Sequence, residues 1–128
     1  MGTFSVSCRI ENPVERSRFA DLPQMLVDTG SEYTWVPATT LEQLGIAREK
    51  NDLSFVMANG QHITRSVGFA ILRYDSYFTI DEVVFAEQGD LLLLGARTLE
   101  GFNLRVDAAQ KKLVAAGPLP AASSQPNT

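Results

Sequence analysis

The sequence has few of the residues from which disulfides, metal sites and catalytic triads are built. Its 128 residues include one cysteine, Cys8, and one histidine, His62. A single cysteine forms no internal disulfide, so we expect a reducing, cytoplasmic setting in which Cys8 is a small buried hydrophobe in a strand. One histidine cannot supply the ligands of a His/Cys zinc site, and no carboxylate metal motif is present. We therefore expect no metal and no cofactor, and we interpret His62 as a surface residue because no Gly-x-Ser-x-Gly elbow accompanies it.

Long apolar runs and basic clusters are also missing. No segment approaches the roughly 18 apolar residues that cross a bilayer, and the start of the chain lacks the basic and apolar regions of a secretory signal. The net charge is −4, from 11 basic and 15 acidic residues, and the longest basic run is Lys111–Lys112. We therefore expect neither a membrane nor a nucleic acid as a partner.

The composition that remains is typical of one soluble globular domain, with 45% hydrophobic and 20% charged residues. Short runs rich in β-branched and aromatic residues, separated by turn residues, predict about eight strands. These runs span 3–10, 21–27, 32–37, 53–58, 61–74, 77–86, 91–94, 102–106 and 112–116. Two short helices are expected, one that Thr39 or Thr40 caps and Gly45 ends, and one over 96–101. The fold class is mostly β, a closed or nearly closed β-barrel-like sheet with one or two short helices.

Two of these runs carry more specific information. Asn59-Gly60 joins the runs 53–58 and 61–74, and this dipeptide predicts a hairpin with a type I′ turn, in which both residues take a positive φ. Leu91–Leu94 is a row of four leucines, which indicates a strand covered on both faces.

The most informative stretch is an apolar run, Met25–Val27, followed by Asp28, Thr29, Gly30 and Ser31. A carboxylate at the end of a buried strand is costly unless its surroundings satisfy it. Gly30 lets the backbone turn tightly and bring an amide close to the Asp28 oxygens, and the two flanking hydroxyls can donate or accept at short range. We interpret the stretch as a carboxylate held rigidly in a dry place.

This stretch, residues 25–31, resembles the active-site loop of aspartic peptidases, in which apolar residues precede Asp-Thr/Ser-Gly and a Ser, Thr or Ala follows. Leu44–Ile46 is similar to the end of the helix that often follows this loop, and Leu93–Gly95 is similar to the second family mark, two apolar residues and a glycine. One Asp-Thr-Gly in a chain of this length resembles the single-domain, retropepsin-like type. The resemblance implies an acid-protease fold equivalent to one pepsin-like lobe, with a peptidase domain at 1–117. Proline, serine, alanine and asparagine dominate the rest of the chain, and this composition predicts a disordered tail at 118–128.

Hydrolysis at an aspartic site needs two carboxyl groups that share one proton, because two like charges a few ångströms apart cannot both ionise. The chain offers only Asp28, since Asp75, Asp81, Asp90 and Asp107 lack the apolar lead-in and the following glycine. The resemblance therefore implies a symmetric homodimer in which each chain contributes one Asp28. The expected activity is that of an aspartic endopeptidase that cuts extended peptides at apolar residues.

The resemblance also assigns supporting roles around Asp28. Thr29 is expected to reach across the two-fold axis with its hydroxyl, and Ser31 to bond the outer oxygen of Asp28. Glu32 occupies the place of a carboxylate that pairs with an arginine after the second family mark. Glu32 and Arg97 are therefore a candidate dimer-bracing pair, although Arg97 stands one residue later than in retroviral members. The alternative is two solvated charges, and an exposed pair adds little stability.

The Asn59-Gly60 hairpin lies between the two family marks, where the family has its flap. A flap opens to admit a peptide and closes to exclude water, so a movable hairpin tip suits this role. We expect the flap tip, Met57, Ala58, Asn59, Gly60 and Gln61, to contact the main chain of the substrate. A simple surface hairpin is the alternative.

Two further interpretations remain open from the sequence. The chain could be a module of the same fold that dimerises or binds peptide without hydrolysis, or a piece of a larger protein in which 118–128 is a linker. Tyr33 and Trp35 are expected in the core or in a pocket wall near Asp28.

Overall fold

The computed structural model describes residues 3–122 of the chain, and within these residues the prediction of a mostly β fold with two short helices is confirmed. The elements are β1 (Ser5–Glu11), β2 (Phe19–Val27), β3 (Thr34–Pro37), α1 (Ala38–Gln43), β4 (Lys50–Val56), β5 (His62–Tyr74), β6 (Tyr77–Ala86), β7 (Leu93–Leu94), α2 (Ala96–Phe102), β8 (Leu104–Asp107) and β9 (Lys112–Ala115). Residues 118–122 carry neither helix nor strand, and 123–128 lie outside the described residues, so the disordered tail stays a prediction.

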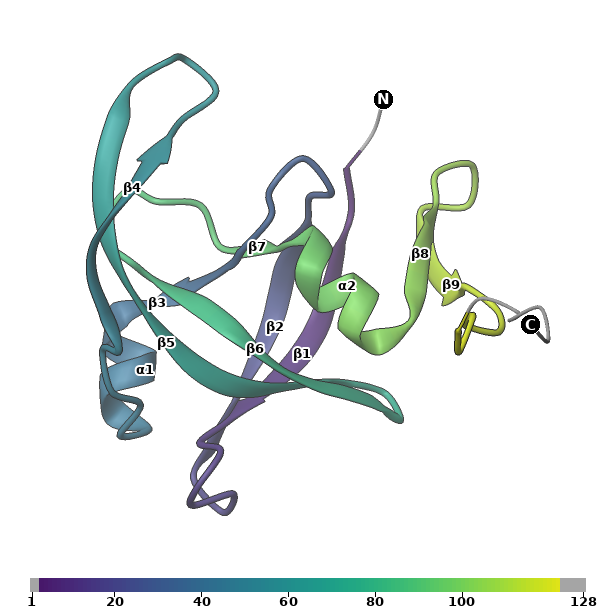
Figure 1. Cartoon of the computed structure of the whole chain (residues 1–128), viewed down its shortest axis with the longest axis horizontal. Helices are drawn as coiled ribbons and strands as arrows, with labels where there is room; N and C mark the ends of the chain where they lie inside the picture. The colour runs from purple at the N-terminus through teal and green to yellow at the C-terminus, as the bar shows by residue number, and fades with distance from the viewer. Residues whose placement is uncertain (1–2, 123–128) are drawn as a thin grey trace, which may run out of the picture.

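The strands β1 to β7 form one sheet in the order β1-β2-β7-β3-β6-β5-β4 (Figure 1). An additional antiparallel pairing between β1 and β5 joins the two sides, so six of these strands form a ring-like sheet. Strand β4 lies outside the ring and pairs only with β5, as one arm of a hairpin. The last two strands, β8 and β9, form a separate two-stranded sheet beyond α2.

The short strand β7 determines where the Asp28 loop lies. Its residues pair in parallel with the end of β2, Leu26 with Leu93 and Val27 with Leu94, and in antiparallel with Trp35 of β3. The residues before and after the Asp28 loop are therefore joined by the same two-residue strand. The predicted strand over 91–94 is wrong in its first half, because Leu91 lies in the loop before β7 and is 66% exposed.

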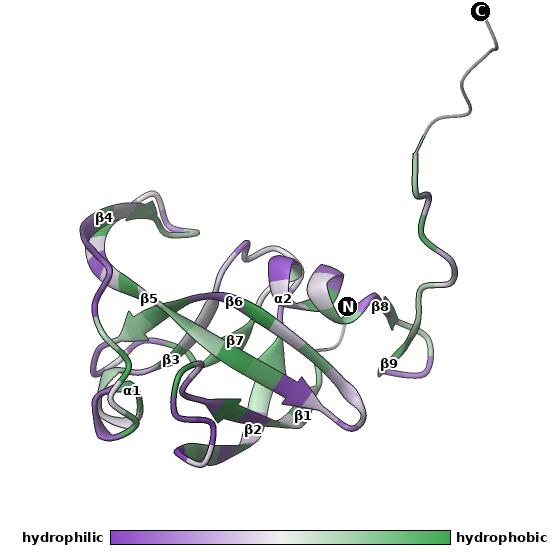
Figure 2. Cartoon of the chain, turned by 60° about the horizontal axis from the view of Figure 1, so that its bottom comes forward, coloured by the Kyte–Doolittle hydropathy of each residue, from purple (hydrophilic) through white to green (hydrophobic). Residues whose placement is uncertain are grey.

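Two hydrophobic clusters fill the structure. The larger one packs the ring against the two helices and the β8–β9 hairpin, and it includes Ile10, Met25, Leu41, Phe85 and Leu94, which are almost completely buried. The smaller one gathers around Trp35 and extends to the hairpin of β4 and β5. Figure 2 shows hydrophobic and hydrophilic residues interspersed along the strands, as expected of strands with one face toward a core. The expected core position of Trp35 is confirmed.

Two local predictions need correction. The hairpin turn is not type I′: only Gly60 has a positive φ, of 85°, and the Asn59 side chain instead accepts a hydrogen bond from the Gln61 amide at 2.9 Å. The Gly60 amide donates to the Met57 carbonyl at 2.8 Å, so a three-residue loop with glycine in the left-handed region closes the hairpin.

Helix α1 also begins earlier than predicted. Pro37 precedes its first residue and no side chain caps it, so neither Thr39 nor Thr40 is the N-cap. Proline fixes its own φ near helical values and so suits the entry to a helix. At the other end Gly45 has a φ of 73°, and its amide donates to the Glu42 carbonyl, so the predicted stop at this glycine is confirmed.

Candidate active site

Asp28 is the first residue after β2, and both its backbone and its carboxylate are held by neighbouring main chain. Its amide donates to the Leu94 carbonyl of β7 at 3.1 Å. The Gly30 amide donates to Asp28 Oδ1 at 2.9 Å, which is the close amide that the sequence predicted. A Cβ on Gly30 would lie 3.1 Å from the same oxygen, so a side chain there would crowd the carboxylate. The tight turn thus orients one oxygen of Asp28.

The surroundings of Asp28 in the single chain are not dry, which corrects the sequence interpretation. Asp28 is half-buried and Thr29 is exposed. A shallow cavity of about 150 Å³ lies beside the loop. Its lining residues come from the start of the chain, the Asp28 loop and the β8–β9 hairpin: Thr3, Phe4, Val27, Asp28, Thr29, Val106 and Ala108. The carboxylate stays accessible because the loop stands at the end of β2, outside the packed interior of the ring.

Ser31 does not bond Asp28 as predicted. Its hydroxyl donates to the Tyr33 carbonyl at 2.9 Å, and a carbonyl oxygen can only accept. The Ser31 hydroxyl has one proton, and because this proton is used in the bond to Tyr33, it is not available to Asp28. What Ser31 gives Asp28 is a backbone contact, because its amide donates to the Asp28 carbonyl at 3.2 Å.

The second family mark packs directly against the loop that follows Asp28. A Cβ on Gly95 would lie 2.3 Å from the Tyr33 carbonyl oxygen and 2.9 Å from that of Glu32, so only glycine fits there. The Arg97 amide then donates to the Glu32 carbonyl at 3.1 Å. The start of α2 and the Asp28 loop therefore form one hydrogen-bonded unit.

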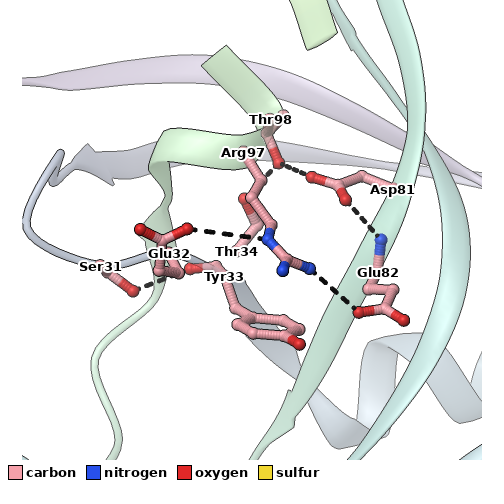
Figure 3. A network of polar contacts seen from close by, with 8 residues as sticks. All are labelled: Ser31, Glu32, Tyr33, Thr34, Asp81, Glu82, Arg97 and Thr98. Carbon is pink, nitrogen blue, oxygen red and sulfur yellow. Dashed lines mark hydrogen bonds and ion pairs between the residues drawn. The ribbon is translucent and has the colours of Figure 1, made fainter. Parts of the chain in front are cut away.

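A buried chain of hydrogen bonds behind this unit was not predicted from the sequence (Figure 3). Thr34 and Thr98 are fully buried, with their hydroxyl oxygens 2.6 Å apart. The Gly95 amide donates to Thr34 Oγ1 at 3.0 Å, and the Thr98 hydroxyl donates to Asp81 Oδ2 at 2.8 Å. Because the carboxylate of Asp81 only accepts, the Thr34 hydroxyl must donate to Thr98. Every hydroxyl in this series of hydrogen bonds has a partner, and the series holds the Gly95 amide in place.

Glu32 and Arg97 do lie in contact, but Arg97 has a closer partner. Arg97 Nε is 3.7 Å from Glu32 Oε2, whereas Arg97 Nη1 is 3.3 Å from Glu82 Oε2 (Figure 3). The guanidinium also lies over the Tyr33 ring, 4.7 Å from its centroid. Hydrogen bonding to Lys50 lowers the pKa of Glu82, with Tyr33 and Arg97 contributing less. No sequence pattern pointed to Glu82, because it lies on β6, far along the chain from the Asp28 loop.

Residues 57–61, for which the sequence predicts the role of a flap tip, stand at the end of the β4–β5 hairpin, which projects from the ring at the upper left of Figure 1. Below the tip, Phe55 contacts two aromatic rings near the Asp28 loop. Its centroid is 5.5 Å from that of Tyr33, edge to face, and 5.1 Å from that of Trp35. The hairpin thus rests on the second hydrophobic cluster, beside the loop that carries Asp28.

The other titratable residues singled out above do not join this site. Cys8 is buried in β1, and burial, with a smaller effect of Asp75, raises the pKa of its thiol to about 12, so the thiol stays protonated. His62 is exposed at the start of β5. No group of three or more His, Cys, Asp or Glu side chains in residues 3–122 is arranged to hold a metal ion. Within the same residues, neither helix has the length and apolar character required to cross a bilayer.

A family model described as gag-polyprotein putative aspartyl protease matches residues 23–101. The match includes the Asp28 loop, the hairpin and Leu93–Gly95. The chain belongs to this family of retropepsin-like aspartyl proteases. Its ring-like β fold is consistent with an aspartic protease fold. Proteins of this family act on peptide substrates, which supports a general protease function. No match was found among curated proteins.

Proposed function

We propose that this aspartyl protease family member is an endopeptidase that works as a symmetric homodimer, with water activated between two Asp28 carboxyl groups. The observation that carries the proposal is the placement of Asp28. Asp28 is half-buried, the Gly30 amide donates to its carboxylate, its own backbone amide donates to the Leu94 carbonyl, and it lies within the stretch that the family model matches. The peptidase domain covers 1–117, and 118–128 is a tail.

The chemistry requires a second carboxyl group close to the first. When two carboxyls share one proton, the ionised one takes a proton from water as the water oxygen attacks the peptide carbonyl carbon. The protonated one gives its proton to the carbonyl oxygen, and the resulting diol collapses as the C–N bond breaks and the leaving nitrogen takes up a proton. One chain supplies one such group, so the second Asp28 comes from a second copy of the chain.

The remaining site residues take supporting roles in this proposal. Thr29 is exposed beside Asp28, which leaves its hydroxyl free to cross the two-fold axis to the partner's loop. Glu32 and Arg97 brace the dimer from the unit formed by the loop and α2. The flap tip, residues 57–61, covers an extended peptide whose apolar side chains fit between the exposed apolar residues of the hairpin and the site.

The test compares the wild type with Asp28→Asn, which keeps the size of the side chain and removes its ionisation. We expect a dimer by sedimentation, cleavage of apolar peptides at acid pH, and binding of a pepstatin-type inhibitor. Asp28→Asn should stay folded and lose cleavage by at least about a thousandfold, because the acid/base pair is gone. The matched control is Asp21→Asn, an exposed aspartate on β2, the strand that leads into Asp28; its carboxylate pairs with Arg9 at the surface.

Two results would contradict the proposal. One is cleavage that survives Asp28→Asn, since the carboxylate would then not be the catalytic group. The other is a monomer at every concentration at which peptide is cleaved, since a single chain holds one such carboxylate. A dimer that binds peptide but leaves it intact would instead support a binding module of the same fold.

A further inference from the structure

The hairpin that carries the flap tip is attached to the rest of the chain by an ion pair of good geometry. Arg65 Nε and Nη2 donate to Asp90 Oδ2 and Oδ1 at 2.7 Å and 2.9 Å, two parallel charge-assisted hydrogen bonds. The side chains of Arg65 and Asp90 are only 14% and 10% exposed. Among the ion pairs of the described residues, this one is bidentate and has both members largely withdrawn from water.

Asp90 is itself fixed within its turn. Its Oδ2 also accepts the Glu87 amide at 2.8 Å, and its own amide donates to the Glu87 carbonyl at 2.9 Å. The Glu87 carboxylate lies 3.7 Å from Arg65 Nη1 and adds a weaker attraction. The turn therefore presents a preorganised carboxylate to Arg65, with little further ordering needed to form the pair.

The pair joins two parts of the candidate site that are far apart in sequence. Arg65 lies opposite Leu53 in the β4–β5 hairpin, between the ring and the tip. Asp90 belongs to the loop that leaves β6 and runs to β7, and Leu93 of β7 pairs with β2 just before Asp28. Figure 1 shows this loop leaving the base of the hairpin and reaching the strand beside the Asp28 loop.

An apolar contact lies one step closer to the tip. Phe55 and Ile63 are cross-strand partners in the hairpin, and both pack against the cluster around Trp35. Beyond them, Val56 is 65% exposed and Met57 36% exposed. The hairpin is thus held by charge at Arg65 and by packing at Phe55 and Ile63, and only its last residues lack such support.

We propose that Arg65 and Asp90 are positioning residues that clamp the base of the hairpin to the β6–β7 loop, so that only the tip beyond Phe55 and Ile63 moves when a peptide binds. This role rests on the proposed function, in which the tip covers the substrate. The Arg65–Asp90 pair confines closure to a short segment and keeps the base of the hairpin in a fixed position relative to the Asp28 loop. Loss of the pair should weaken peptide binding more than the chemical step, because neither residue touches the reacting atoms.

The experiment is amide hydrogen exchange on the full chain, alongside peptide kinetics and urea unfolding. The variants are Asp90→Asn, Arg65→Met and the double variant, which removes both largely buried charges together and so guards against simple loss of folding. The control is Glu42→Gln, which breaks the 2.7 Å pair between α1 and Arg48, two residues before β4 and outside the segment 54–64. We expect amides of residues 54–64 to exchange about tenfold faster in all three pair variants, with KM raised and kcat changed much less.

Unchanged exchange in residues 54–64 would overturn the proposal. So would faster exchange spread evenly over the ring in step with lost urea stability, since the pair would then only support the fold. Hydrogen exchange needs no peptidase activity, so these outcomes are independent of the proposed function. If the wild type cleaved no peptide, the proposed function would be wrong, but hydrogen exchange would still test whether Arg65 and Asp90 hold the base of the hairpin.

Discussion

At the scale of single residues, the candidate site depends on buried residues that pack against the loop after Asp28. Gly95 lies against the backbone of Glu32 and Tyr33, where no side chain fits. Its amide is held by Thr34, which donates to Thr98, and Thr98 donates to Asp81. Buried polar groups are stabilising only when each finds a partner, and every member of this chain does.

This chain of hydrogen bonds predicts the effect of Thr98→Val. Valine has nearly the same shape but no hydroxyl, so the fully buried Thr34 loses its acceptor and the half-buried Asp81 loses a donor. We expect a loss of about 1–3 kcal/mol in the free energy of unfolding, measured by urea titration. Thr39→Val, an exposed threonine on α1, is the control and should change stability by less than about 0.5 kcal/mol. Equal effects of the two substitutions would contradict the role given to Thr98.

At the scale of elements, the ion pair between Arg65 and Asp90 joins the β4–β5 hairpin to the β6–β7 loop. Arg65 lowers the pKa of Asp90 chiefly through its hydrogen bonds, against an opposing effect of burial. The folded chain therefore binds the Asp90 proton less tightly than the unfolded chain does. The stability that this gives is complete above the unfolded pKa and is lost as the pH falls through the lower, folded pKa.

The consequence is a pH-dependent difference between the wild type and Asp90→Asn. We expect the wild type to exceed the variant in free energy of unfolding by a constant amount near neutral pH. The gap should narrow as the pH falls below about 4, where the carboxyl of an unfolded chain begins to bind its proton. Urea unfolding of both proteins between pH 7 and pH 3 measures the gap. A gap that widens toward acid would mean that Asp90 is not stabilised in its charged form.

The same elements show what a sequence reveals and what it hides. Local patterns predicted the mostly β class, the strand before Asp28, the hairpin and the stop of α1 at Gly45, because each depends on a few adjacent residues. The predicted type I′ turn was wrong because Asn59 accepts a hydrogen bond from the Gln61 amide with its side chain and does not take a positive φ. The prediction of a covered strand over all four leucines was wrong in its first half, because Leu91 is exposed in the loop before β7.

Contacts between distant residues were beyond such patterns. Thr34 and Thr98 are separated by 64 residues, and Arg65 and Asp90 by 25. Threonines and charged residues are common in strands, helices and loops alike, so nothing in their local sequence marks these residues as partners. The tertiary fold creates these pairs: α2 packs against β3 and β6, and the pairing of β5 with β6 brings Arg65 near the loop that follows β6.

At the scale of the whole molecule, one chain presents one candidate catalytic carboxylate, half-buried in an open loop. A shared proton requires a second carboxylate within a few ångströms, and the symmetric solution is a second copy of the same loop. We therefore expect only dimers to cleave peptides, and not single chains. The experiment that tests this changes which chains make up the dimer.

The most direct measurement is peptide cleavage by mixtures of the wild type and Asp28→Asn at constant total protein, after exchange of subunits. If both carboxyls are needed, only pairs of two wild-type chains cleave, so an equal mixture should retain about a quarter of the activity and the decline should follow the square of the wild-type fraction. Asp21→Asn in place of Asp28→Asn should leave the activity unchanged. A decline in direct proportion to the wild-type fraction would show that each chain cleaves alone, and the shared Asp28 pair would be wrong.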